Sequence, residues 1–127
     1  LYDSLQSSEV SARLGAAHRE AGAETGRVLI RRVWIGPPPE AEMAAQMDHY
    51  RSYANEAATK NWTDDSLVHG DTPVAAAEAL LAVLAESDCD TVNVRVHVNG
   101  LTPAQVDDQL TRHADGFVDA VRAGLAG

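Results

Sequence analysis

The polar side chains most able to do chemistry lie on one predicted strand, residues 91–98 (TVNVRVHV). Its valines alternate with Asn93, Arg95 and His97, so an extended chain points the two sets to opposite faces. Parallel strands covered by helices are usually apolar on both faces. We therefore expect the valines to pack on helices and the polar face to line a barrel interior or a cleft. An unpaired arginine is costly to bury, so Arg95 needs a carboxylate, a ligand anion or water there.

A second predicted strand, residues 27–35 (RVLIRRVWI), shows a weaker form of the same asymmetry, with Arg32 and Trp34 on one face. His97 lies nearest the carboxyl end of its own strand, which is where parallel α/β proteins place their chemistry. We expect Trp34 to join His97 at the mouth of that site. Together these side chains favour a site wall.

His69 is a further candidate, because it precedes a predicted helix start at Thr72-Pro73. Free N–H groups at a helix N-terminus suit a phosphate or a carboxylate. Each candidate also has a simpler interpretation. The arginines could pair with buried carboxylates, His97 could form a hydrogen bond within the core, and His69 could precede a plain helix cap.

Metal and thiol chemistry are not indicated. One cysteine among five histidines gives no zinc-binding pattern. Cys89 lies between two aspartates, whose charge disfavours a reactive thiolate. Met43 and Met47 have helical spacing and are expected to fill the core. The sequence assigns no catalytic residue.

The composition bounds the class of protein. The chain has 127 residues, enough for one domain, and 10 Lys+Arg against 19 Asp+Glu give a net charge of −9. That sign disfavours nucleic acid and anionic membranes as partners. No apolar run approaches the roughly 20 residues that span a bilayer. The single cysteine fits a reducing compartment, so a cytoplasmic location is expected.

Hydrophobic periodicity and capping signals predict alternating strands and helices. The expected elements are helix 7–22, strand 27–35, helix 39–58, short strand 66–69, helix 73–87, strand 91–98 and helix 103–124. The buried faces of the first and last helices are expected to carry Val10, Leu14 and Ala17, and Val106, Leu110, Phe117, Val121 and Leu125, respectively. The stripe of helix 73–87 is expected to be Val74, Ala77, Leu80, Leu81 and Leu84. Successive strand–helix units predict a parallel sheet with right-handed crossovers.

Three segments carry a family resemblance: RVLIRRVWIGPPP, QMDHYRSYA, and the stretch from HGDTPVAAAEALL through TVNVRVHVNGLTP to FVDAVR. They resemble the C-terminal part of luciferase-like monooxygenases, the bacterial luciferase superfamily of flavin-dependent (β/α)8 barrels. The resemblance covers nearly the whole chain from Arg27 onward. It implies the C-terminal part of a TIM barrel, with the three strands as the sixth to eighth of the barrel.

The resemblance also implies a function. The coenzyme would be FMN or a deazaflavin, the substrate a small organic molecule, and the reaction an oxidation, hydroxylation or reduction. Trp34, Arg95 and His97 would contribute to the wall around the coenzyme. A complete barrel takes about 250 residues. We therefore expect this chain alone to be inactive and to need the missing N-terminal half of the barrel or a second copy of itself.

Two other interpretations remain. The chain could be a non-catalytic half-barrel that self-associates or binds a partner. It could also be a small doubly wound α/β domain that binds a ligand at the carboxyl ends of its strands.

Overall fold

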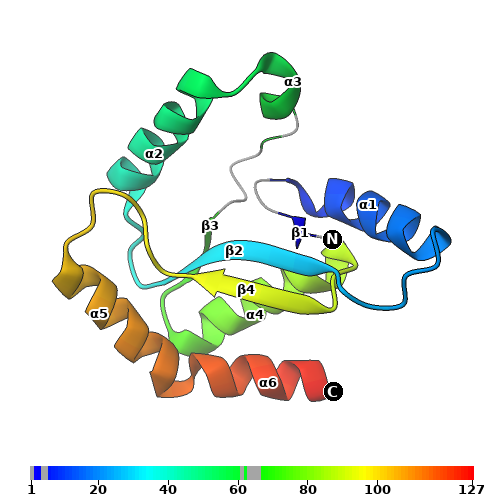
Figure 1. The fold of residues 1–127 in the computed structure, drawn as a ribbon. Coiled ribbons are helices and arrows are strands. Elements are labelled where there is room, and N and C mark those ends of the chain that lie inside the picture. The colour runs from blue at the N-terminus through cyan, green and yellow to red at the C-terminus, as the bar shows by residue number, and fades with distance from the viewer. Residues whose placement is uncertain (1, 4–5, 61, 63–66) are drawn as a thin grey trace.

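The computed structural model describes residues 2–3, 6–60, 62 and 67–127, and its fold is a mixed α/β arrangement around a small open parallel sheet (Figure 1). The elements are β1 (Tyr2–Asp3), α1 (Ser8–Glu20), β2 (Val28–Ile35), α2 (Glu40–Tyr53), α3 (Glu56–Thr59), β3 (Leu67–Gly70), α4 (Pro73–Ser87), β4 (Thr91–Arg95), α5 (Pro103–Arg112), the π-helical turn η2 (His113–Phe117) and α6 (Val118–Ala126). The predicted α/β class with parallel strands is confirmed.

β2 is the central strand of the sheet. It pairs with β4 along one edge, where Arg32 lies opposite Arg95, and with β3 along the other, where Trp34 lies opposite His69. The short β1 pairs with the start of β2. In a (β/α)8 barrel each strand lies between its neighbours in sequence, so β3 would separate β2 from β4. The order β3–β2–β4 is instead that of an open, doubly wound sheet.

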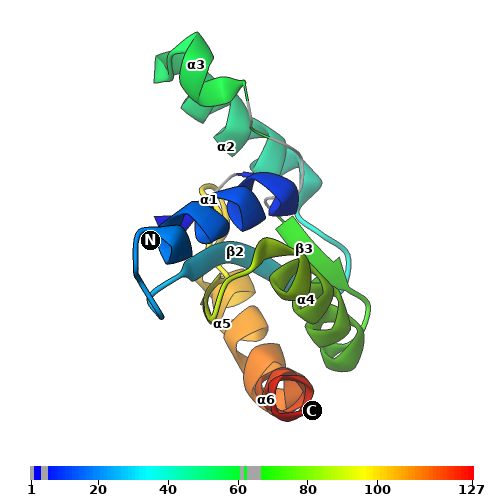
Figure 2. The same cartoon turned by 90° about the vertical axis from the view of Figure 1, so that its right-hand side faces the viewer.

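The helices cover the two faces of β2 unequally. The face that carries Leu29, Val33 and Ile35 is buried in a core with α4, η2 and α6, and Figure 2 shows α4 and α6 on this side. The core cluster comprises Val33, Ile35, Val68, Ala76, Ala77, Leu80, Phe117 and Val121. α2 contacts the other face through Arg32 and Tyr50. The loops after β2 and β4 therefore lead to opposite sides of the sheet, as Figure 1 shows for α2 and α5.

The first helix begins and ends close to the predicted positions, with Ser7 capping the N–H of Val10 at 3.3 Å. Its predicted inner face is wrong, because Leu14 is 42% exposed while Ser11 and Gly15 are buried. The reason is a close approach: a Cβ on Gly15 would lie 2.8 Å from the Asp88 carboxylate. Small residues, rather than the largest apolar ones, therefore face the end of α4.

Three further boundaries differ from the prediction. The predicted helix 39–58 ends at Tyr53, because Asn55 starts a separate turn by accepting a bond from the Ala58 N–H at 2.8 Å. The short strand runs from Leu67 to Gly70, and Ser66 of the predicted strand lies outside the described residues. β4 stops pairing at Arg95, although Val98 beyond it is buried.

Helix 73–87 is confirmed at both ends, with Thr72 as its cap. The predicted helix 103–124 begins at Pro103 with the expected capping box, but it is interrupted at Asp115 and Gly116, whose φ is 104°. Two residues of the predicted inner face, Leu110 in α5 and Leu125 near the end of α6, are 52% and 58% exposed, whereas Gln109, Phe117 and Val121 are buried. In α4, Val74 is also exposed, since it lies in the first turn. The described helices include none with the length and apolar character needed to cross a membrane.

Candidate functional site

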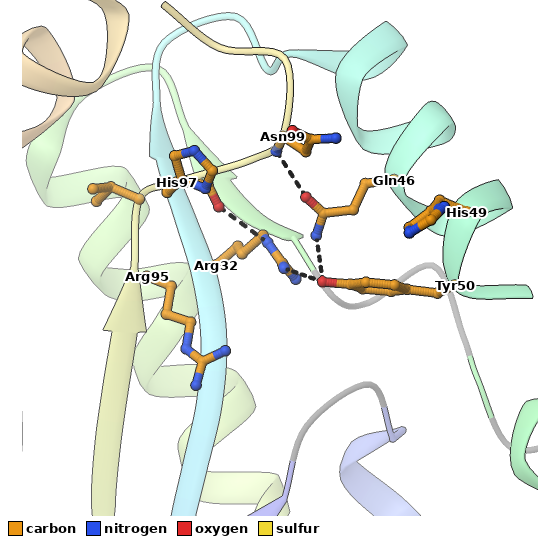
Figure 3. A pocket seen from close by; sticks show the side chains of 8 residues that line it. Arg32, Gln46, His49, Tyr50, Arg95, His97 and Asn99 are labelled. Carbon is orange, nitrogen blue, oxygen red and sulfur yellow. Dashed lines mark hydrogen bonds between the residues drawn. The ribbon is translucent and has the colours of Figure 1, made fainter. Parts of the chain in front are cut away.

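A pocket of about 570 Å³ opens at the carboxyl ends of β2 and β4, beside α2 (Figure 3). It is lined by Arg32, Gln46, His49, Tyr50, Arg95, Val96, His97 and Asn99. Open α/β sheets bind ligands where the loops after adjacent strands leave toward opposite faces, and β2 and β4 meet that condition. Among the residues that the structure describes, the lining includes no aspartate or glutamate, although the chain carries a net charge of −9.

Arg32 and Arg95 are paired in register, so their side chains leave the same face of the sheet. The Arg32 Nε donates to the His97 carbonyl at 3.3 Å, and its Nη2 donates to the Tyr50 hydroxyl at 3.2 Å. The exposed Arg95 donates from Nε to the side-chain oxygen of Asn93 at 3.4 Å. Within the part of the chain that the structure describes, neither arginine forms an ion pair with a carboxylate. The simpler interpretation, in which buried carboxylates neutralise them, is not what these residues show.

The predicted division of strand 91–98 into two faces is confirmed within β4, but beyond its end Val96, expected on the packed face, lines the pocket with Arg95 and His97. Val92 and Val94 pack against the core, whereas Asn93, Arg95 and His97 are exposed on the other face. The alternation in the sequence was sufficient to place Arg95 and His97 in one wall. Val92 and Val94 pack against the same core cluster to which α4 contributes Ala76, Ala77 and Leu80.

α2 supplies the side of the pocket that the sequence analysis missed. The buried Gln46 donates from Nε2 to the Tyr50 hydroxyl oxygen at 2.9 Å, and its Oε1 accepts a bond from the Asn99 N–H at 2.8 Å. These bonds connect α2 to the loop after β4. The available signal was a polar pair four residues apart, Gln46 and Tyr50, on the same helix as the buried Met43 and Met47.

Aromatic rings continue the pocket along α2. His49 and Tyr50 line it, and Tyr53 contacts both rings from outside the lining, with centroid distances of 5.4 Å to His49 and 6.1 Å to Tyr50. Trp62 lies 6.5 Å from Tyr50 in an edge-to-face arrangement. Rings of this kind offer apolar faces next to the guanidinium groups.

Trp34 and His69 do not join this pocket, which corrects the prediction that Trp34 meets His97 at its mouth. Trp34 is only 7% exposed, and its indole N–H donates to the Pro37 carbonyl at 2.8 Å. This bond ties the indole to the loop that follows Ile35. His69 is exposed and lines a second cavity of about 560 Å³ with Met43 and Met47, both of which are buried as expected. Thr72 caps α4 by accepting a bond from the Ala75 N–H at 3.2 Å, as the simpler interpretation predicts.

Two titratable groups outside the pocket are perturbed. Burial lowers the pKa of His113, while the bond between its Nδ1 and the Gln109 carbonyl, at 2.7 Å, opposes that shift. The hydroxyl of Thr91 donates to Asp90 and lowers the pKa of that carboxyl, and the nearby Arg27 lowers it further. Neither group lines the pocket, so these shifts bear on stability.

Comparison of the chain with protein-family models, with curated proteins and with solved structures found no match. Across the described residues, no three or more His, Cys, Asp or Glu side chains cluster in a way that could hold a metal ion.

Proposed function

We propose that the pocket at the carboxyl ends of β2 and β4 binds an anionic ligand, with Arg32 and Arg95 as its charge partners. The observation that carries this proposal is the register pairing of the two arginines in a pocket whose described lining residues include no aspartate or glutamate. Two adjacent guanidinium groups repel each other, so an anion between them is favourable. Arginine also presents several N–H groups in a fork that matches carboxylate and phosphate oxygens.

The N–H groups of Arg32 and Arg95 determine how many hydrogen bonds the pocket can donate to a ligand. A guanidinium has five N–H groups, and the structure gives Arg32 two acceptors and Arg95 one, among the described residues. His97 adds an exposed ring beside them. The pocket therefore offers an excess of donors, which suits a ligand that carries acceptor oxygens.

We further propose that the ligand is FMN or a deazaflavin coenzyme, as the resemblance to luciferase-like monooxygenases implies. Such a coenzyme joins a planar ring to a phosphate, and the pocket places arginines beside the rings of His49 and Tyr50. The chain would then be the C-terminal part of an oxidoreductase that acts on a small organic substrate. The coenzyme would supply the redox chemistry, and this chain would bind and orient it.

If the chain is part of a barrel, its strand order must differ from the order in this structure. Completing the barrel requires β3 to lie between β2 and β4, whereas here β2 lies between the other two. Arg95 would then stand two strands from Arg32, or about 10 Å at the usual strand spacing. A doubly wound binding domain keeps the arginines adjacent, so the separation of these two side chains distinguishes the two architectures.

Titration of the purified chain with FMN and, separately, with phenyl phosphate tests the proposal. We expect both to bind, and we expect Arg95→Ala and His97→Ala to weaken binding while the chain stays folded. Arg122→Ala is the matched control, because Arg122 is exposed on α6 and far in sequence from the pocket residues. Absence of binding by the wild type would refute the anion site. Equal affinity for the two probes would support the anion site but contradict the proposal that its ligand is a flavin.

A second candidate function, self-association or binding of a partner chain without catalysis, has its own support. The outer edge of β4 has no paired strand among the described residues, and exposed strand edges readily pair with other chains. Sedimentation equilibrium of the isolated chain tests this candidate. A stable dimer that binds neither probe would favour it over the anion site.

A further inference from the structure

The side-chain amide of Gln46 has a fixed orientation. The backbone N–H of Asn99 can only donate, so the group facing it at 2.8 Å must be the amide oxygen of Gln46. The amide nitrogen then faces Tyr50, at 2.9 Å from its hydroxyl oxygen. Gln46 is 6% exposed, and the reversed amide would leave two donors facing each other in a buried place.

The Tyr50 hydroxyl also meets a second donor. Arg32 can only donate, and its Nη2 lies 3.2 Å from the same phenol oxygen. With Gln46 and Arg32 both donating, the hydroxyl oxygen is used as an acceptor from two directions. Its own proton must point away from both donors, and Figure 3 shows this hydroxyl between Arg32 and Gln46 at the pocket.

We propose that Tyr50 determines the specificity of the site by donating its hydroxyl proton to an oxygen of the bound ligand. This inference rests on the proposed anion site and adds the ligand class, which is an unprotonated oxyanion such as a phosphate monoester dianion. A ligand that presents only N–H donors at this point, such as an ammonium group, is disfavoured, because the proton of the half-buried Tyr50 hydroxyl then has no acceptor on the ligand. Gln46 and the Asn99 N–H are positioning groups, since they act on the ligand only through Tyr50.

The experiment measures the affinity of the chain for phenyl phosphate at pH 8. A phosphate monoester has a second pKa of about 6, so the probe is a dianion there. Tyr50→Phe keeps the ring contacts and removes the hydroxyl, and we expect about tenfold weaker binding, the range of a lost hydrogen bond to a charged group. Tyr53→Phe is the matched control on the same helix, because Tyr53 lies outside the pocket lining, and it should change the affinity less than twofold.

A second pair of variants tests the direction of the hydrogen bond. In Gln46→Glu the carboxylate can still accept from the Asn99 N–H, but its other oxygen accepts from Tyr50 and diverts the hydroxyl proton from the ligand. The added charge also weakens anion binding. If the proton is diverted, adding Tyr50→Phe to Gln46→Glu should change the affinity less than twofold. A full tenfold loss in that background would contradict the proposed orientation.

The outcomes separate the two proposals. Binding that is weakened by Arg95→Ala but unchanged by Tyr50→Phe overturns the role of Tyr50 and leaves the anion site in place. A wild-type chain that binds no phenyl phosphate overturns both. Binding that depends on Arg95 and Tyr50 but not on Tyr53 is the result we expect.

Discussion

Gln109 on α5 holds the last residue of β2 by both of its backbone groups. The Gln109 side-chain oxygen accepts from the Ile35 N–H, and its nitrogen donates to the Ile35 carbonyl, both at 2.9 Å. β4 has stopped pairing with β2 by this point, since the last pair is Arg32 with Arg95. The Gln109 side chain thus takes the place of a neighbouring strand for backbone groups that are buried with Ile35, which is 2% exposed.

Replacement of Gln109 by leucine leaves both Ile35 groups without these partners. Each unpaired buried polar group costs about 1–3 kcal/mol, so we expect the free energy of unfolding to fall by roughly 2–5 kcal/mol. Urea unfolding, read from the midpoint at constant slope, measures the loss. Gln105→Leu on the same helix is the control, because Gln105 is an exposed member of the capping box and should cost only about 1 kcal/mol. Equal losses in the two variants would contradict the role given to Gln109.

Gly70 ends β3 against the first turn of α4. A Cβ at this position would lie 2.6 Å from the carbonyl carbon of Ala75 and closer still to the Ala76 nitrogen. These are backbone atoms of a helix, so they cannot move as a flexible side chain can. We expect Gly70→Ala to destabilise the chain by about 3 kcal/mol or more, at the upper end for overpacking.

Gly22→Ala provides the comparison for Gly70. Gly22 has a φ of 91°, and apart from its chain neighbours no heavy atom of the described residues lies within 4 Å of the position its Cβ would take. That substitution adds backbone strain without a clash and should cost only about 1–2 kcal/mol. Both variants can be measured by the same urea unfolding. A larger loss at Gly22 than at Gly70 would show that the close approach of β3 to α4 does not limit the fold.

The sequence predicted those elements whose local signals agree with their tertiary contacts. α4 begins at Pro73 after a Thr72 cap and ends at Ser87, where Asp88 adopts a φ of 56°, and both ends were predicted. The last helix was predicted without its interruption, because an apolar periodicity that spans Gly116 does not show whether the helix bends there. The range of α1 was predicted correctly but its buried face was not, because Gly15 is buried against Asp88 and Arg27, which lie far from it in the sequence.

The site was predicted as far as strand alternation allows. Arg95 at the end of β4 and His97 two residues beyond it line the same pocket, and Arg32 lies opposite Arg95 in the register. The register itself, and the position of α2, depend on contacts between distant segments. For that reason Gln46 and Tyr50 were missed, and Trp34 was placed in a pocket that it does not line.

His113 should make stability depend on pH near neutrality. Its pKa is lowered by burial, so the unfolded chain binds a proton at a higher pH than the folded chain does. The stabilisation is complete above the ordinary histidine value of about 6.5 and decreases as the pH falls below it, by at most about 1.4 kcal/mol per pH unit. Urea unfolding at pH 7.5 and at pH 5.5 should show this decrease in the wild type and a smaller one in His113→Asn.

Two further residues, His18 and Asp90, test whether the pH dependence of stability arises from His113. His18→Asn, on α1 and only half-buried, controls for the loss of a histidine outside the core and is measured at the same two pH values. Asp90 has a lowered pKa, so its contribution is present above its ordinary value of 3.8 and is lost only below it, outside the range tested. An equal pH dependence in the wild type and His113→Asn would assign the effect to another group.

Replacing either arginine of the pocket should weaken ligand binding, but only the replacement of Arg32 should lower the free energy of unfolding appreciably. Arg32 ties the His97 carbonyl to the Tyr50 hydroxyl, so Arg32→Ala should lower the free energy of unfolding by about 1–2 kcal/mol, the sum of two ordinary hydrogen bonds. Arg95 is exposed and bonds only to Asn93 among the described residues, so Arg95→Ala should change it by less than about 0.5 kcal/mol. Urea unfolding without ligand measures both losses, and phenyl phosphate titration should show weaker binding in both variants. If Arg95→Ala is as destabilising as Arg32→Ala, Arg95 has a packing role that its exposure does not reveal, and its weaker binding could no longer be read as the loss of a ligand contact.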